Sequence, residues 1–482
     1  MIDFRPVLFA TGILLVILAA AMVVPAVADA AAGDPDWLVF ASSAAVTLFV
    51  GVALVLTNRV RAAGGSIRQA FVLVTFSWIV MAAFAALPFA FSQLDLSYTD
   101  AFFEAMSGIT TTGSTVITGL DHAPPGILLW RGLLEWLGGI GIIVMAVSVL
   151  PMLRVGGMQL FRIEFGDVSD KVLPRAGQIV VGMGIIYVVL TVVFAAVLYG
   201  LGMTGLEAAV HSMAALSTGG FSTSDQSVGV FNSAAIDWVV TLAMLAGGMP
   251  FVLYLQAVRG NPGQLLRDRQ VQWYLAAALV AVLVLAGWLW LARDVAAMDA
   301  LRLAAFNAVS IMTGTGFITA DFGTWGGFAV AVFLLLMFIG GCAGSTSCGI
   351  KIFRFQVLYA AAEVQMKRLL QPNGVFIPYY NRQPISEGVI MSVLAFIFIY
   401  AFCFVLLALA LGLIGLDFLT AVSGAATAIS NVGPALGEII GPAGTFAPLP
   451  ESAKWVLSAG MLLGRLELFS VLVLFMPAFW RG

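Results

Sequence analysis

Four short glycine-centred loops recur along the chain, and each follows a run of small and apolar residues. Four such loops around one axis can replace the water shell of a cation with backbone carbonyl oxygens. Glycine suits this task because its missing Cβ permits the dihedral angles and close approaches that aim carbonyls at one point. We therefore predict a cation filter formed by Thr111, Thr112, Gly113, Thr218, Gly219, Gly220, Gly314, Thr315, Gly316, Asn431, Val432 and Gly433.

The four loops occupy equivalent places in an internal repeat. Their central glycines lie 107, 96 and 117 residues apart, and the sequences before them align without gaps. A period of about 100 residues matches one pore module of span, short helix, loop and span. Helix packing through small residues explains any single loop equally well. Four loops in register between paired spans favour a pore.

The composition places these modules in lipid. The chain of 482 residues is 61% hydrophobic and 10% charged, with a mean hydropathy of +1.05. Crossing a hydrocarbon core of about 30 Å takes about 20 apolar residues. The ten stretches of this kind lie near residues 7–28, 37–57, 69–91, 127–150, 178–201, 236–258, 271–292, 327–340, 388–414 and 453–479.

The segments that lead into the glycine loops are too short to cross. About 11 residues at 1.5 Å each reach roughly 16 Å, near half the hydrocarbon depth. A half-helix that enters from outside points its partially negative C-terminal end at the membrane centre, where it favours a cation. The predicted half-helices are residues 100–109, 205–216, 300–312 and 417–429. The carboxylates that suit their N-terminal ends are Asp100, Glu207, Asp299 and Asp417.

These elements predict an all-α polytopic membrane protein. Four pseudo-symmetric repeats of span, pore half-helix, filter loop and span surround one pore, and two extra transmembrane helices precede them. The predicted boundaries are 1–62 for the N-terminal pair and 63–175, 176–268, 269–384 and 385–482 for the repeats. Most Lys and Arg residues fall inside when both termini are cytoplasmic, and an acidic set of loops then faces outward.

Two features below the predicted filter interrupt the apolar spans. The run from Gly340 to Gly349 holds small residues that do not sustain a helix, and a break at mid-membrane lines a cavity. Arg465 lies in the middle of the last span, where a cation is costly and faces a cavity or a partner. The alternative for Arg465 is an ion pair with Glu467 that only satisfies its charge.

Several motifs together resemble the Trk-type potassium uptake proteins over nearly the whole chain. They are the four loops, the residues 150–160, the run from Gly340 to Thr346 and the sequence Gly464-Arg465-Leu466-Glu467. The two extra spans before the first repeat are similar to the TrkH and TrkG branch of the Trk/Ktr/HKT superfamily, rather than to the shorter Ktr branch or the plant HKT proteins.

The resemblance implies roles for individual residues. Gly113, Gly220, Gly316 and Gly433 match the four filter glycines, and a glycine in the first loop implies a preference for potassium over sodium. Arg465 matches an electrostatic barrier below the filter. In the family, an intramembrane loop obstructs the permeation path and moves during gating. The residues that match this loop here are Gly340, Gly341, Cys342, Ala343, Gly344, Ser345 and Thr346. Ser347 and Cys348 stand where the family loop is richer in glycine.

The resemblance also implies partners. It predicts potassium as the permeant ion, a homodimer with one pore per protomer, and a cytosolic TrkA-like ring that binds NAD(H), ATP or ADP. The chain itself has no nucleotide-binding motif, so it is expected to bind no cofactor, and no nucleic acid. Residues 352–383 are the expected contact with the second protomer or the ring. The expected location is the inner membrane of a bacterium, in contact with the lipid bilayer.

Other classes of protein fit less well. A sodium- or proton-coupled secondary transporter of another cation or small solute also has internal repeats, but these are commonly inverted, whereas the repeats here are parallel. An enzyme needs a catalytic constellation, and none stands out. His122 and His211 are too far apart in sequence to suggest a metal site. Glu104 either attracts cations or hydrogen-bonds behind the filter. The cysteines Cys342, Cys348 and Cys403 do not suggest a disulfide framework.

Overall fold

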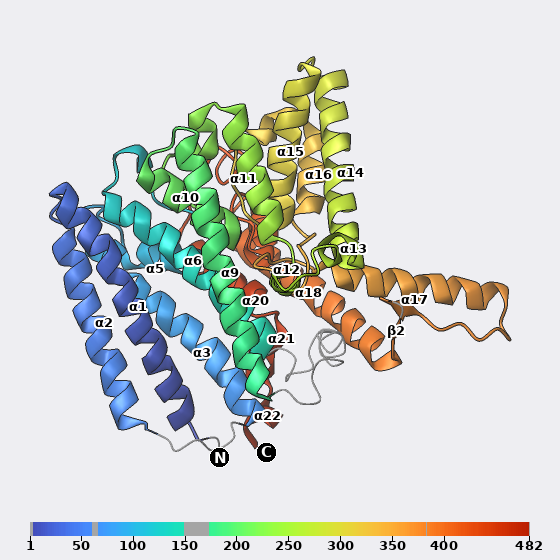
Figure 1. The fold of residues 1–482 in the computed structure, drawn as a ribbon, viewed down its shortest axis with the longest axis horizontal. Helices are drawn as coiled ribbons and strands as arrows, with labels where there is room; N and C mark the ends of the chain where they lie inside the picture. Colours follow the sequence, from blue (N-terminus) through green and yellow to red (C-terminus); the bar gives the residue numbers. More distant parts are fainter. Residues whose placement is uncertain (1–2, 60–65, 149–172, 382, 482) are drawn as a thin grey trace.

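The computed structural model describes residues 3–59, 66–148, 173–381 and 383–481. The motif at 150–160 and several of the basic residues expected on the inner side therefore lie outside the described residues. The described chain is predominantly helical, as predicted, and its one sheet is the two-stranded hairpin of β1 (Tyr379–Tyr380) and β2 (Gln383–Pro384). Both termini lie at the same end of the helical bundle (Figure 1).

The first two helices form a pair at one side of the molecule. Helices α1 (Arg5–Ala32) and α2 (Trp37–Thr57) lie side by side and are joined by a short turn at Gly33. Both are long and apolar enough to cross a membrane. The two predicted N-terminal spans are thus confirmed as helices.

Four repeats of the same design follow. Repeat 1 contains α3 (Ile67–Ala85), α4 (Leu87–Phe91), α5 (Tyr98–Ile109) and α6 (Pro125–Ser148). Repeat 2 contains α9 (Leu173–Gly200), α10 (Gly205–Ser217), α11 (Ala234–Gly247) and α12 (Phe251–Val258), followed by α13 (Gln264–Arg267). Repeat 3 contains α14 (Arg269–Ala292), α15 (Ala297–Thr313), α16 (Gly327–Leu336) and α17 (Ile352–Leu370). Repeat 4 contains α18 (Glu387–Leu413), α19 (Phe418–Ser430), α20 (Glu451–Arg465), α21 (Phe469–Leu472) and α22 (Pro477–Arg481).

The four half-helices are α5, α10, α15 and α19, with 12, 13, 17 and 13 residues. Local sequence fixes where three of them begin, because Ser97, Thr204 and Asp417 accept hydrogen bonds from backbone N–H groups of the first turn. The side-chain and backbone hydrogen bonds of Thr420 lower the pKa of Asp417, so this carboxylate stays ionised at the positive end of α19. The carboxylates predicted at the half-helix starts are therefore confirmed there.

The second spans of the repeats differ from the prediction. Only the span of repeat 3 was expected to break, but those of repeats 2 and 4 also bend, by 96° between α11 and α12 and by 107° after α20. The apolar stretches predicted at 236–258 and 453–479 therefore each contain a bend that the sequence analysis did not predict. Pro250 cannot donate a backbone hydrogen bond, and Glu467 and Leu468 have positive φ angles of 57° and 50°, which end the helical hydrogen bonding.

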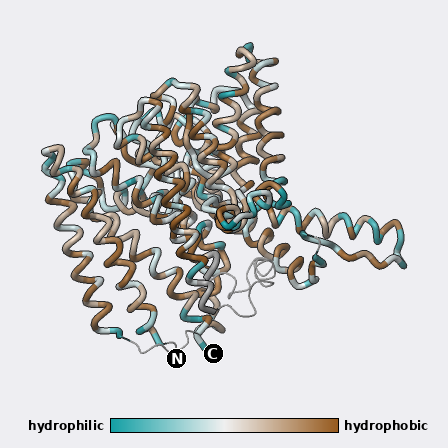
Figure 2. The backbone as a smooth tube through the Cα atoms, in the orientation of Figure 1, coloured by the Kyte–Doolittle hydropathy of each residue, from teal (hydrophilic) through white to brown (hydrophobic). Residues whose placement is uncertain are grey.

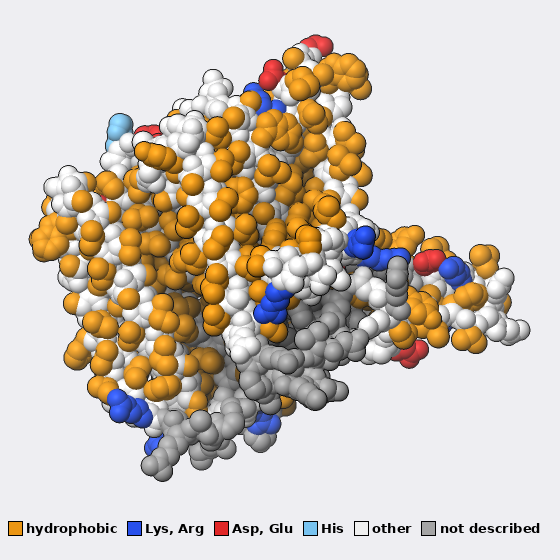
Figure 3. Space-filling model, viewed as in Figure 1, with side chains coloured by type: hydrophobic (Ala, Val, Ile, Leu, Met, Phe, Trp, Pro, Cys, Tyr) orange, Lys and Arg blue, Asp and Glu red, His pale blue; other side chains and the backbone are white. Residues whose placement is uncertain are grey.

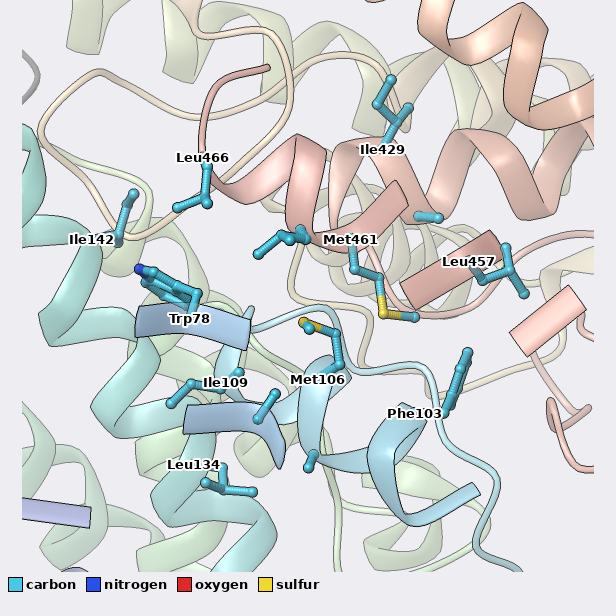
Figure 4. Close-up of a cluster of buried hydrophobic side chains, with 14 of the residues drawn as sticks. Trp78, Phe103, Met106, Ile109, Leu134, Ile142, Ile429, Leu457, Met461 and Leu466 are labelled. Atoms are coloured by element: carbon cyan, nitrogen blue, oxygen red, sulfur yellow. The ribbon is translucent and has the colours of Figure 1, made fainter. Parts of the chain in front are cut away.

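The surface and core agree with a membrane environment. Seven described helices are long and apolar enough to cross a membrane, or nine when each bent pair counts as one span. Hydrophobic residues cover the outward faces of these helices (Figures 2 and 3). Inside, a buried cluster joins repeat 1 to repeat 4 (Figure 4). Its residues include Trp78, Phe103, Met106, Ile109, Leu134, Ile142, Ile429, Leu457, Met461 and Leu466.

Candidate functional site: the four-loop ring and the loop beneath it

The four filter loops share one backbone conformation. The filter glycines have φ angles of 82°, 88°, 83° and 106° at Gly113, Gly220, Gly316 and Gly433. The residue two positions earlier also has a positive φ, between 52° and 74°, at Thr111, Thr218, Gly314 and Asn431. Positive φ is uncommon outside glycine, and a repeated pair of such residues is a specific signature. The repeat seen in the sequence is therefore a repeat in the backbone.

The same hydrogen bond closes each half-helix onto its loop. In every repeat the N–H of the residue just before the filter glycine donates to the carbonyl five residues earlier, at 2.8 to 3.1 Å. The donors are Thr112, Gly219, Thr315 and Val432, and the acceptors are Ser107, Ala214, Ser310 and Thr427. This bond occupies the N–H groups and leaves the carbonyls of the loop residues free to point elsewhere.

Those carbonyls interlock around one axis. A Cβ on Gly113 would overlap the carbonyl oxygen of Gly219, and a Cβ on Gly433 would lie 2.9 Å from that of Thr112. In the same way, a Cβ on Gly220 would overlap the carbonyl oxygen of Thr315, and a Cβ on Gly316 would overlap that of Val432. Each filter glycine thus faces the residue that precedes the glycine of the next loop, and the fourth contact returns to the first loop. We call the carbonyls of Thr112, Gly219, Thr315 and Val432 the carbonyl ring.

The ring is closed but not fourfold. Threonine hydroxyls lie 2.7 Å apart in the first and third loops, at Thr110 and Thr112 and at Thr313 and Thr315. In the fourth loop the amide of Asn431 instead donates to the Thr112 hydroxyl at 2.9 Å. The arrangement can offer several oxygen ligands to a cation on the axis.

A cavity of about 250 Å³ opens on the side of the ring that the sequence analysis predicts to face outward. All four filter glycines line it, together with Asp225, whose carboxylate accepts from the N–H groups of Gly119 and Leu120. The predicted acidic outer face is smaller than the sequence suggested. Asp29 is fully buried, and Asp100 forms an ion pair with Lys454.

The glycine-rich break of repeat 3 lies directly beneath the ring. The Thr346 hydroxyl donates to the carbonyl of Leu216 at 2.8 Å, and the Ser347 hydroxyl donates to that of Thr313 at 2.6 Å. Both carbonyls belong to the last turns of half-helices. The N–H of Cys342 donates to the carbonyl of Gly248 in the broken span of repeat 2 at 2.9 Å. We call residues 340–349 the inner loop.

Arg465 completes the closure from the opposite side. Its guanidinium donates to the carbonyls of Thr346 and Gly138, at 3.1 and 2.8 Å, and lies 2.8 Å from the sulfur of Cys348. The side chain is 1% exposed. The ion pair considered as an alternative for Arg465 does not form, because Glu467 pairs with Arg354. Arg465 therefore joins repeats 1 and 4 to the inner loop.

The space beside the inner loop is small and is lined by charged side chains of both signs, Lys351, Arg465 and Glu467. A cavity of about 20 Å³, enough for about one water molecule, is lined by Cys348, Lys351 and Arg465 among other residues. The Lys351 ammonium donates to the carbonyl of Ser347. A cation that leaves the ring downward meets these charges and the backbone of the inner loop.

The other residues considered in the sequence analysis lie outside the carbonyl ring. Glu104 hydrogen-bonds behind the first loop, and His211 is buried with partners on both ring nitrogens. His122 is exposed on an outer loop, and the three cysteines are buried and unbridged. Among the described residues, no group of three His, Cys, Asp or Glu side chains could hold a metal ion.

Two charged residues near the ring were not singled out from the sequence. Arg131 and Glu135 lie on α6, and both are almost completely buried. Glu135 accepts from the N–H of Phe221 at 2.9 Å, and Arg131 donates to the carbonyl of Ser222 at 2.6 Å. They hold the second loop against α6. Their presence inside an apolar span was the available signal, because such charges need partners.

Comparison with known proteins agrees with this arrangement. The family model described as "TrkH: Cation transport protein" matches residues 38–481. The chain is 45% identical to the Trk system potassium uptake protein TrkI of Halomonas elongata, covering 99% of this chain and 97% of that protein. It is 37% identical to the Trk system potassium uptake protein TrkH of Salmonella typhimurium, covering 99% of both.

The fold also matches an experimental structure. The crystal structure of the potassium transporter TrkH from Vibrio parahaemolyticus superimposes with a TM-score of 0.92, at 35% sequence identity and over 100% of both chains. The four repeats, the two extra helices and the family match give one conclusion: this chain belongs to the TrkH family of cation transport proteins.

Proposed function

We propose that this protein takes up potassium ions across the cytoplasmic membrane through the carbonyl ring. The observation that carries the proposal is the interlocked contact of four filter glycines with four neighbouring carbonyls. A ring of this kind supplies oxygen ligands and no net charge, which suits a large monovalent cation that must bind and leave. The relatives named as potassium uptake proteins support the choice of ion. The filter ligands are the twelve residues predicted from the sequence.

The inner loop and Arg465 form the gate in this proposal. The hydroxyls of Thr346 and Ser347 hold the loop against the half-helix ends, and Arg465 holds it from the other side. These hydrogen bonds must be exchanged before an ion passes. Because the loop contains several glycines, its backbone has the freedom to adopt a second conformation.

Two kinds of partner belong to the proposal. A cytosolic nucleotide-binding ring would bias the gate from the inner side, and a second copy of the chain would form a homodimer. Helix α17 projects away from the bundle (Figure 1), and Leu370 and Val375 near its tip are 83% and 90% exposed. Such exposed apolar residues favour a protein contact at residues 352–383.

The alternative is a secondary transporter that couples a cation to sodium or protons. Cation flux into proteoliposomes, with and without an imposed proton gradient, separates the two. Flux that follows the potassium gradient alone supports a gated pore. Flux that requires the proton or sodium gradient supports coupling, and flux of an organic solute contradicts both the ring and its assigned ion.

A further inference from the structure

A buried polar side chain stands at nearly the same place behind every filter loop. The residues nine positions before the filter glycines are Glu104, His211, Asn307 and Gly424. In the fourth repeat, where this residue is glycine, the polar residue is Ser423, one position earlier. All four polar residues are 0% exposed. Buried polar groups are costly unless they hydrogen-bond, so each needs a partner at this site.

In the first repeat the partner is the extended segment that follows the filter glycine, which we call the strand that leaves the filter although it belongs to no sheet. The Glu104 carboxylate accepts from the N–H of Val116 and from the hydroxyl of Thr115, both at 2.9 Å. These residues lie three and two positions after Gly113. Arg131 donates to the same carboxylate at 2.9 Å and balances its charge. Glu104 therefore ties the half-helix that enters the filter to the strand that leaves it.

The second and third repeats make the same connection with neutral groups. His211 Nε2 lies 2.9 Å from the Ser222 hydroxyl, and its Nδ1 lies 2.8 Å from the carbonyl of Glu207. A carbonyl only accepts, so Nδ1 carries the proton and Nε2 accepts from Ser222. Asn307 accepts from the N–H of Thr319 at 3.3 Å and donates to its hydroxyl at 3.0 Å.

The fourth repeat has the smallest connection. The Ser423 hydroxyl accepts from the N–H of Leu436 at 3.1 Å, three positions after Gly433. The same hydroxyl faces the carbonyl of Leu419 in its own helix at 2.6 Å. One hydroxyl thus serves where the first repeat uses a carboxylate and a guanidinium.

We propose that Glu104, His211, Asn307 and Ser423 are positioning residues that set the width of the carbonyl ring and therefore the preference among monovalent cations. The bonded strand residues lie only two or three positions beyond the filter glycines, within about 10 Å of extended backbone. The ring carbonyls are in contact with the next glycine, so a strand that shifts moves its neighbours too. This inference rests on the proposed cation conduction through the ring.

The four connections differ in chemistry, so the loops are held unequally. Hydrogen bonds to a charged group are stronger than neutral ones. Of the four connections, the one made by Glu104 and Arg131 in the first repeat is therefore the strongest, and the one made by the Ser423 hydroxyl in the fourth repeat is the weakest. The loss of preference among cations when one of these residues is substituted depends on how many hydrogen bonds its side chain supplies.

The third repeat offers the cleanest test because no charge is involved. Asn307→Leu keeps the side-chain volume and removes both bonds to Thr319, whereas Asn307→His restores a polar group of the kind used in repeat 2. Ser107→Ala is the matched control, because the Ser107 hydroxyl is buried on a half-helix and has no hydrogen-bond partner among the described residues. Rubidium uptake into proteoliposomes, with sodium or potassium as competitor, measures discrimination, and melting in detergent measures folding.

The measured quantity is the ratio of the inhibition of rubidium uptake by potassium to its inhibition by sodium. We expect Asn307→Leu to lower this ratio at least threefold and Asn307→His to recover part of the loss. Ser107→Ala should leave the ratio unchanged. A folded Asn307→Leu protein with the wild-type ratio would overturn the inference. If that variant does not fold, Thr319→Val, which removes one hydroxyl, must lower the ratio about twofold, and an unchanged ratio overturns the inference. A wild-type protein that does not discriminate between the ions refutes the proposed function itself.

Discussion

At the scale of single residues, the proposed path depends on the four filter glycines and on Arg465. The four filter glycines were identified because a glycine at the same place in four repeats indicates a shared backbone conformation. Arg465 was identified because a charge within an apolar span needs a partner or a cavity. Its contacts with Gly138, Thr346 and Cys348 come from segments far apart in sequence, and no spacing rule gives them.

The first residue-scale prediction concerns Gly113→Ser. The new Cβ would overlap the carbonyl oxygen of Gly219, so that carbonyl must move and the ring must change shape. We expect sodium to compete with rubidium uptake severalfold better than in the wild type. Gly119→Ser is the control, because Gly119 has a similar φ of 75° but nothing within 4 Å of the added Cβ. Equal competition in the two variants would contradict the ring geometry.

The second concerns Arg465→Ala. Removing the guanidinium deletes a buried positive charge, a hydrogen bond to the inner loop at Thr346 and a hydrogen bond to α6 at Gly138. We expect rubidium uptake to rise severalfold in protein that is correctly inserted. Arg259→Ala, at an exposed position on the chain, should leave uptake unchanged. Unchanged uptake in Arg465→Ala would show that this side chain does not restrain the path.

At the scale of elements, the half-helices were predicted to within about three residues at each end. The bends in the second spans of repeats 2 and 4 were not predicted. Hydropathy does not register a bend, because the residues on both sides of it stay apolar. Pro250 after two glycines was the local signal for the break in repeat 2. The break in repeat 4 has no such signal. Glu467 and Leu468 have positive φ angles there, and Glu467 pairs with Arg354 of repeat 3, a contact that local sequence does not reveal.

The contact that accompanies this last break gives an element-scale prediction. Glu467 pairs with Arg354 at the start of α17, so the ion pair links the bend of repeat 4 to the helix that follows the inner loop. Glu467→Gln removes the carboxylate that pairs with the buried Arg354 guanidinium, and removal of one partner of a buried pair costs about 3–5 kcal/mol. We expect a lower melting temperature in detergent, measured against Glu387→Gln, which alters an exposed carboxylate.

The double variant with Arg354→Met separates pairing from other losses. The double variant lacks the Arg354 guanidinium as well as the Glu467 carboxylate. The two substitutions together should therefore destabilise the protein less than the sum of the single effects. Additive effects would mean that the two side chains do not depend on each other.

At the scale of the whole molecule, one chain builds a closed ring from four unequal quarters. Ion pairs cross two opposite boundaries between repeats: Arg302 of α15 pairs with Asp237 of α11 at 2.7 Å, and Lys454 of α20 pairs with Asp100 of α5. The second span carries the acidic residue, Asp237, at the first of these boundaries and the basic residue, Lys454, at the second. The half-helix carries the opposite charge in each case. The period of the sequence predicted the repeats, but pairs that cross repeats are visible only in three dimensions.

The exchanged charges predict the outcome of a swap at the boundary between repeats 4 and 1. Lys454→Asp alone places like charges together with Asp100 and should lower the melting temperature in detergent. Adding Asp100→Lys restores an opposite pair in the reverse order and should recover most of the loss. A double variant that is less stable than Lys454→Asp would show that the order of charges, and not their attraction, matters at this boundary.

The central claim is that the ring of four glycine loops conducts potassium selectively. The most direct test is uptake of radioactive rubidium into proteoliposomes that contain the purified protein, with excess potassium or excess sodium as competitor. The account predicts that potassium blocks rubidium uptake and that sodium at the same concentration does not. Equal block by both ions, or no cation uptake at all in correctly folded protein, would contradict it.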